Sequence, residues 1–261
     1  MAFDLQVFNK QTHLMATEVL AQQVKLFNAA SGGAIELSTA PARGDFDVTS
    51  SFKEIAGLVR NRNVYGTGAI AHQRLSQSVN AAVKVAVGTP TIDWTPAEYA
   101  WTLQNPELAA LKIGEQLGVA RLGDMLNSAI AAAAAATGGN TEAVYDGSAS
   151  VPTFKVLNKG AAKFGDRSSD IRAWVMHSTT MHGLYDNALS NVERLFTYEG
   201  VNVLRDPFGR LFIVSDSPAL INGTTYKTLG LTGGGVSVSS NDDFNSVLVP
   251  TVGFENIGAS Y

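Results

Sequence analysis

The fold is decided by residues 95–139, which read TPAEYAWTLQNPELAALKIGEQLGVARLGDMLNSAIAAAAAATGG. This stretch opens with the clearest helix-start signal of the chain. Thr95 can cap a helix, Pro96 suits its first position, and Glu98 completes a capping box. A helix is therefore predicted to begin at Pro96.

A second proline interrupts this helix. Pro106 has no amide hydrogen and its ring clashes with the preceding turn, so we predict a bend or a restart at Pro106. The helical pattern then runs to about Ala136, where Thr137-Gly138-Gly139 ends it. About 30 residues rising 1.5 Å each span roughly 45 Å, which predicts a spine helix that supports a domain.

The spine helix carries small residues within its apolar stripe. The large or apolar members of that stripe are Leu108, Leu111, Leu122, Met125 and Ala129. Gly114 and Gly118 continue the stripe, and each glycine costs a helix about 1 kcal/mol. We therefore predict that another backbone packs closely against them. Glu115, Arg121 and Asp124 argue against a helix pair inside a membrane.

A further helix is predicted over Leu5 to Ala30, ended by Ser31-Gly32-Gly33. Its apolar residues are Leu5, Phe8, Met15, Val19, Leu26 and Phe27. This arm precedes the first compact element. It can pack on its own chain or on a neighbouring one, and the sequence leaves both open.

Extended structure is predicted between Ile35 and Thr95, where glycines and prolines separate short segments rich in β-branched residues. Apolar residues share odd positions here: Leu75, Val79, Val83, Val85 and Val87. This alternation predicts a strand that is apolar on one face. A two-stranded ribbon is marginal alone, so its apolar face needs another surface. Arg60, Arg62 and Arg74 could meet acidic groups across that contact.

The remaining chain reads as a compact α/β unit followed by extended segments. The predicted elements are helices over Phe154–Phe164 and Ser178–Leu189, and strands over Ile171–Met176, Val201–Leu204 and Leu211–Val214. The last two strands flank a turn at 206–209. Asn222-Gly223 predicts a hairpin turn, and Gly233-Gly234-Gly235 breaks the next extended stretch before Val236. Because strand-like sequence reaches Tyr261, we expect the native polypeptide to continue.

Composition favours a protein that assembles permanently with other subunits. Charged residues make up 16% of the chain and hydrophobic residues 45%, against about 25% charged in typical soluble domains. A surface so low in charge favours burial against other subunits. The net charge of −4 and the absence of cysteine leave no chain-wide attraction to DNA and no thiolate metal site. Residues 125–136 are too short to span a membrane.

The chain shows no convincing catalytic, cofactor or metal motif. Residues 66–71 match a loose dinucleotide pattern, but no strand precedes them and no acidic residue follows at the required spacing. His177, His182 and Asp186 lack the spacing of a metal site, so packed or capping histidines are expected. Asp206 and Asp216 flank strands and are assigned to turns. Neither a Gly-x-Ser-x-Gly elbow nor a Gly-Lys-Ser phosphate loop occurs.

The order of these elements resembles the tailed-phage capsid family with its Hong Kong 97-type fold. The closest likeness lies in residues 171–178, IRAWVMHS, and in residues 206–218, DPFGRLFIVSDSP. The resemblance implies an α+β protein with an N-terminal arm, an extended loop, a spine helix in a peripheral domain and an α/β axial domain. The corresponding ranges are 1–34, 35–94, 95–150 and 151–221, with returning strands at 222–261.

The implied function is that of a major capsid protein without enzymatic activity. Subunits would form pentamers and hexamers of an icosahedral shell around double-stranded DNA, assembled in the host cytoplasm and found in the virion. Portal, scaffolding or decoration proteins are possible partners, DNA contact would be weak and non-specific, and no membrane is involved. Lys84 lies in the hairpin, but no acceptor for a covalent cross-link is recognisable.

Two other classes remain open at this point. An encapsulin-like compartment would share the fold but enclose a cargo enzyme. A secreted filament or surface-layer protein would share the composition but should show heptads or repeats, and we find none. An enzyme with an unrecognised site is the weakest alternative.

Overall fold

The structure is a computed structural model that describes residues 5–39, 46–53, 55, 58–90, 93–190, 208–240, 249–252 and 257–260. The chain forms two compact units, one over residues 42–90 and the other over 1–41 and 91–261. The unit over residues 42–90 contains fewer residues than the extended region expected over 35–94. The reason is that β1 (Ile35–Ser38) pairs in parallel with β10 (Val236–Ser239) of the larger unit. The mixture of helices and strands fits the α+β class.

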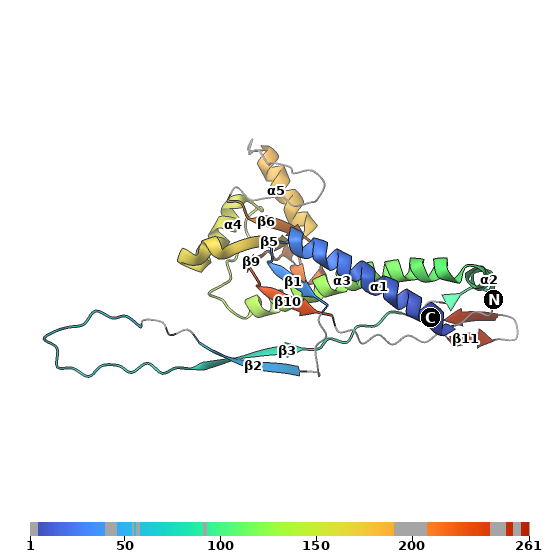
Figure 1. Ribbon diagram of the computed structural model, residues 1–261. Coiled ribbons are helices and arrows are strands. Elements are labelled where there is room, and N and C mark those ends of the chain that lie inside the picture. The colour runs from blue at the N-terminus through green and yellow to red at the C-terminus, as the bar shows by residue number, and fades with distance from the viewer. Residues whose placement is uncertain are drawn as a thin grey trace. The chain divides into compact units, whose positions relative to one another are not determined.

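The larger unit is built on two long helices, α1 (Leu5–Ala30) and α3 (Pro106–Gly138). They run alongside each other, as the blue and green ribbons of Figure 1 show. The arm therefore packs on its own chain, which answers the question that the sequence left open. On α1 the buried residues repeat every four positions: Phe8, Thr12, Ala16, Leu20 and Val24.

The two helices approach most closely at the glycines of α3. A Cβ atom at Gly114 would lie 2.8 Å from the Thr12 carbonyl oxygen, and one at Gly118 would lie 2.9 Å from the Ala16 carbonyl oxygen. Real Cβ atoms do not come this near to backbone oxygens, so only glycine fits at either position. The predicted close packing of another backbone is confirmed.

The predicted buried stripes of both helices were partly wrong. Leu108 and Leu111 are 48% and 38% exposed, and Leu26 of α1 is 65% exposed. The buried positions of α3 are Ala109, Ala110, Gly114, Gly118, Met125, Ala129, Ile130, Ala133 and Ala134. At Gly114 and Gly118 the short distance between the helix backbones leaves no room for a larger residue.

The spine is broken as its second proline predicts. Helix α2 (Pro96–Gln104) begins with the complete Thr95 and Glu98 capping box. Asn105 then leaves the helical conformation, with φ −132° and ψ 60°, and α3 starts at Pro106. Helix α3 ends at Gly138, two residues beyond the predicted Ala136.

A three-stranded sheet with β5 (Ile171–Met176) in its centre forms the second core of the larger unit. Strand β6 (Leu211–Val214) pairs with one edge of β5 in parallel orientation. Strand β9 (Leu229–Thr232) pairs with the other edge of β5 in antiparallel orientation. Alternate residues of β5 enter two separate cores. Ala173 and Val175 pack toward Ala129 and Ile130 of α3. The opposite face of the sheet packs on the helices α4 (Phe154–Ala161) and α5 (Ser178–Ser190).

Short elements complete the larger unit. They are η1 (Ala162–Asp170), η2 (Pro218–Leu220), β4 (Asp93–Trp94), β7 (Ile221–Asn222), β8 (Thr225–Tyr226), β11 (Val249–Val252) and β12 (Ile257–Ser260). The predicted turn at Asn222-Gly223 joins β7 to β8, with Gly223 at φ 61°. Strand β12 lies between β11 and β4, beside the start of α2. The strand predicted over Val201–Leu204 lies outside the described residues.

The smaller unit is a hairpin of β2 (Phe46–Phe52) and β3 (Gln77–Val83), paired in antiparallel. The backbone amide of Lys53 donates to the Ser76 carbonyl at 2.8 Å and extends the pairing by one step. Residues 58–76, which connect the strands, contain neither helix nor strand. In the part of the chain that the structure covers, no helix combines the length and apolar character that crossing a membrane requires.

Candidate subunit-contact surfaces

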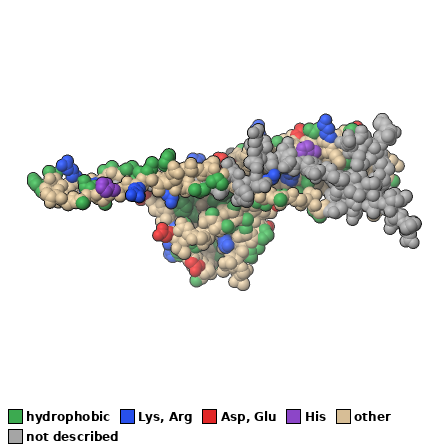
Figure 2. All heavy atoms as spheres, turned by 90° about the horizontal axis from the view of Figure 1, so that it is seen from below, with side chains coloured by type: hydrophobic (Ala, Val, Ile, Leu, Met, Phe, Trp, Pro, Cys, Tyr) green, Lys and Arg blue, Asp and Glu red, His purple; other side chains and the backbone are tan. Residues whose placement is uncertain are grey.

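The hairpin has one apolar and one polar face. Directly opposite residues lie on the same face of an antiparallel pair, and the register pairs Ser50 with Val79 and Phe52 with Gln77. Val48, Phe52 and Val79 therefore share a face, and they are 64%, 67% and 68% exposed. Figure 2 shows hydrophobic side chains along the hairpin and its loop. Among the described residues of this unit there is no second layer that could cover them.

The structure places the predicted contact residues in three settings. Val79 lies within β3 and Val83 is its last residue, although the side chain of Val83 is outside the described part. Leu75, Val85 and Val87 flank β3 and are exposed, so the strand is shorter than the alternation predicted. Valines in alternation have high strand propensity, but only residues 77–83 find partners on β2.

The sequence prediction missed the contribution of β2. Val48 and Phe52 occupy even positions of the strand and therefore one of its faces. The intervening Asp47, Thr49, Ser50 and Ser51 weaken the alternation. Reading the two strands as a pair, instead of reading the second alone, would have found this half of the apolar face.

The loop at the end of the hairpin is basic and apolar. Arg60, Arg62 and Arg74 are all exposed in it, and the sequence has no Asp or Glu from residue 55 to 92. Its exposed large apolar residues are Leu58, Val59, Val64, Tyr65, Ile70 and Leu75. The glycines of the loose dinucleotide pattern at 66–71 lie in this loop, with no strand before them and no helix after them. A nucleotide site is not built there.

Exposed apolar side chains on α2 and α3 form a second candidate surface. It consists of Trp101, Leu108, Leu111 and Val119, between 38% and 52% exposed. Glu98, Glu107 and Glu115 accompany them, together with Lys112, whose Nζ atom lies 3.1 Å from a Glu115 carboxylate oxygen. Hydrogen bonds from the backbone and hydroxyl of Thr95 lower the pKa of Glu98, which keeps this carboxylate ionised. The surface is thus apolar with acidic groups, complementary in charge to the hairpin loop.

The two histidines at the strand-to-helix junction are structural. The Nδ1 atom of His177 accepts from the Thr179 amide at 3.2 Å, and its ring stacks on Tyr226 with centroids 4.7 Å apart. Asp216 accepts from the Ser178 amide at 3.3 Å, so it caps α5 instead of serving the expected turn. The ring of His182 packs near Tyr185. Asp206 lies outside the described residues. Across the described ranges no group of His, Cys, Asp and Glu is placed to hold a metal.

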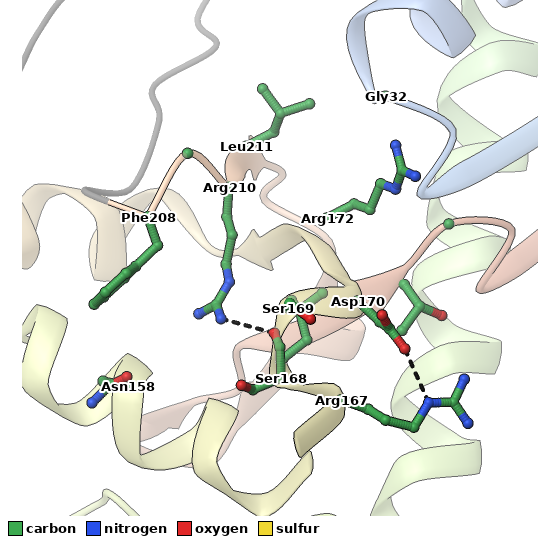
Figure 3. Close-up of a pocket in the computed structure, with 14 residues that line it drawn as sticks. Gly32, Asn158, Arg167, Ser168, Ser169, Asp170, Arg172, Phe208, Arg210 and Leu211 are labelled. Carbon is green, nitrogen blue, oxygen red and sulfur yellow. Dashed lines mark hydrogen bonds and ion pairs between the residues drawn. The ribbon is translucent and has the colours of Figure 1, made fainter. Parts of the chain in front are cut away.

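A pocket of about 970 Å³ opens beside the central sheet of the larger unit. Figure 3 shows Arg167, Arg172 and Arg210 around it, with Asp170 as the acidic member of the described lining. The Arg167 Nε atom lies 3.0 Å from an Asp170 carboxylate oxygen. Arg210 donates to the Ser168 carbonyl at 2.8 Å. No histidine lines the described part of this pocket, so a general base that titrates near neutral pH is missing from it.

Exposed apolar surfaces on a hairpin and on a spine helix, beside histidines used for capping and packing, are typical of a structural protein that acts by contacts with other chains. The chain matches the Gp13-like family, described as major capsid protein 13-like, over residues 4–261, and it belongs to that family. It is thus a bacteriophage major capsid protein, a structural component of the virion capsid and not an enzyme. No curated protein matches the chain.

Proposed function

We propose that this chain assembles, through pentamers and hexamers, into an icosahedral shell that encloses the double-stranded DNA of a tailed phage. In this proposal the fold is of the Hong Kong 97 type. The helices α2 and α3 with the β11-β12-β4 sheet belong to the peripheral domain, and the β6-β5-β9 sheet belongs to the axial domain. The observation that carries the proposal is the apolar face of the hairpin.

That face needs a partner for energetic reasons. A two-stranded ribbon in water is marginally stable because it has no second layer. Covering Val48, Phe52 and Val79, which are at least 64% exposed, would contribute several kcal/mol at about 25 cal/mol per Å². Repeated at every copy of the subunit, this contribution favours the closed shell over free subunits.

The acidic and apolar surface of α2 and α3 is the complement that we assign to the hairpin on a second copy. The hairpin loop brings arginines and exposed aliphatic side chains, and the helix surface brings Trp101, Leu108 and ionised carboxylates. Each exposed ion pair contributes only about 0 to 1 kcal/mol, so charge sets the register and apolar burial supplies the affinity.

The subunit's contact with the packaged DNA follows from its net charge. A chain with a net charge of −4 gives no general attraction to DNA, so its contact with the packaged genome is weak and non-specific. Portal, scaffolding and decoration proteins are further partners of such a shell, which we propose to form in the host cytoplasm. The capsid family favours this proposal over a cargo compartment or a filament.

Electron microscopy of the purified protein tests the proposal. We expect closed particles with fivefold and sixfold clusters of subunits. Open filaments, or a monomer at concentrations where capsid proteins assemble, would contradict the shell. Particles that form around a cargo enzyme and exclude DNA would support the compartment instead.

A further inference from the structure

The pocket beside the central sheet contains an arginine placed there by a backbone irregularity. In the pairing of β5 with β9, Ile171 lies opposite Thr232 and Ala173 opposite Leu231, so Arg172 is an extra residue in a β-bulge. A bulge redirects a side chain away from the regular alternation of a strand. Arg172 is exposed and lines the pocket beside Gly233, where an added Cβ would lie 3.5 Å from its Nε atom. It has no ion pair with any described residue.

A second arginine of the pocket is held in place by aromatic rings. The guanidinium of Arg210 lies 5.6 Å from the ring of Trp174 and 5.5 Å from the ring of Phe208. Phe208 is 66% exposed. With three arginines and one aspartate, the described lining has an excess of positive charge. Arginine next to exposed aromatic surface is typical of the centre of a protein interface, and its planar fork suits a carboxylate.

The same chain carries an acidic loop whose charge is opposite to that of the pocket. Between residues 122 and 154 the sequence has no Lys or Arg, and the loop after α3 contains Glu142 and Asp146. Hydrogen bonds from Ser148 lower the pKa of Asp146, so this carboxylate is ionised and oriented. Val144 of the loop and Val151, which directly follows it, are 43% and 66% exposed.

Helix α4 separates this loop from the pocket. A Cβ at Gly147 would lie 2.9 Å from Val156 Cγ1, so the loop packs against that side of α4. Lys159 holds the loop from the same side, with its ammonium 5.7 Å from the centroid of Tyr145. Asn158 lines the pocket. It follows Val156 by two residues, which places it about 200° further around the helix axis. Loop and pocket therefore lie on roughly opposite sides of one helix.

Complementary surfaces on opposite sides of a domain are what a head-to-tail contact requires, and a head-to-tail contact that closes gives a ring. We propose that the acidic loop 140–150 of one subunit inserts into the arginine pocket of the next copy within a ring. This inference rests on the proposed function, because it describes how the rings of the shell close. A concave pocket with an exposed phenylalanine suits a protein loop better than it suits the DNA backbone.

Charge exchange tests the contact. Arg172→Glu, or Glu142→Lys with Asp146→Lys, places like charges against each other and should reduce assembled particles about tenfold or more. Combining all three changes in one chain should restore the particles, since the charges are again opposite. Lys163→Glu, an exposed residue of η1 outside the pocket, is the matched control and should assemble normally. Normal assembly of Arg172→Glu, or no recovery in the combined variant, would overturn the proposal.

Cross-linking gives a second measurement that does not depend on particle yield. The chain has no cysteine, so Ser169→Cys in the pocket with Ala149→Cys in the loop can join only different subunits if the loop enters a neighbour's pocket. Oxidised particles should then give a ladder that ends at covalent pentamers and hexamers, whereas each single variant should stop at dimers. Particles without a ladder overturn this inference alone; a wild-type chain that makes no particles refutes the proposed function itself.

Discussion

Gly114 of α3 lies so close to Thr12 of α1 that a Cβ atom at position 114 would be 2.8 Å from the Thr12 carbonyl oxygen. The neighbouring obstacle is backbone, which cannot rotate out of the way as a side chain can. The pairing of the two long helices therefore depends on the absence of a Cβ atom at this position, as it does at position 118.

Gly114→Ala should destabilise the subunit by about 1 to 3 kcal/mol, because the added methyl group forces the two helices apart. Gly123→Ala in the same helix is the matched control. Nothing lies within 4 Å of a Cβ at position 123, so this change should stabilise the helix by up to about 1 kcal/mol. Urea unfolding followed by circular dichroism measures both. Equal effects of the two substitutions would refute the close approach.

Phe52→Asp with Val79→Asp should leave a folded subunit that does not assemble, since both changes place charge on the apolar face of the hairpin. Thr49→Asp with Ser78→Asp puts the same charges on the polar face, also at two positions that are diagonal to each other, and should still assemble. Sedimentation measures assembly and circular dichroism measures folding. If the first variant unfolds, the apolar face belongs to the core of its own subunit; if it forms normal shells, that face is exposed to solvent.

Replacing Arg60, Arg62 and Arg74 with alanine should weaken particles without preventing their formation. Exposed ion pairs contribute about 0 to 1 kcal/mol each and are screened by salt. The wild-type particles should therefore lose stability as ionic strength rises, while the triple variant should respond less. A salt series analysed by sedimentation checks this, and an identical response of both proteins would remove the arginines from the contact.

The cap of α5 predicts a pH dependence. Hydrogen bonds from Ser178, with a smaller contribution from the charge of His177, lower the pKa of Asp216 below its ordinary value of 3.8. A carboxyl whose folded pKa is depressed stabilises the protein above its unfolded pKa and loses that effect as pH falls through the folded value. Wild type should therefore melt above Asp216→Asn at pH 7, and the two should converge below pH 3.8. A difference that persists unchanged in acid would exclude this cap.

Much of the larger unit is predictable because local signals set its element boundaries. The capping box at Thr95, the glycines after α1 and the apolar run of β5 depend on a few adjacent residues, and the structure has all three where the sequence placed them. Burial within α3 is different. Leu108 is predicted to be buried because it is large and apolar, yet the helix buries Gly114 and Gly118 instead. The distance between the backbones of α1 and α3 depends on both helices and cannot be read from the sequence of one.

The candidate surfaces were only half visible in the sequence. Val79 and the arginines of the hairpin loop follow from alternation and composition. Val48 and Phe52 require the cross-strand register, and the pocket requires the parallel pairing of β5 with β6, which brings Arg172 and Arg210 together from positions far apart in the chain. Sequence patterns report on neighbours along the chain and not on neighbours across a sheet.

The helix break at Asn105 gives the subunit a joint at the end of a lever. Helix α3, with 33 residues, is about 50 Å long, so a turn of about 5° at this joint moves the far end of the lever by roughly 4 Å. Two backbone torsions at a single residue can absorb such a turn while the contact between α1 and α3 stays unchanged. In the proposed shell, this joint would let one amino-acid sequence occupy positions of different curvature.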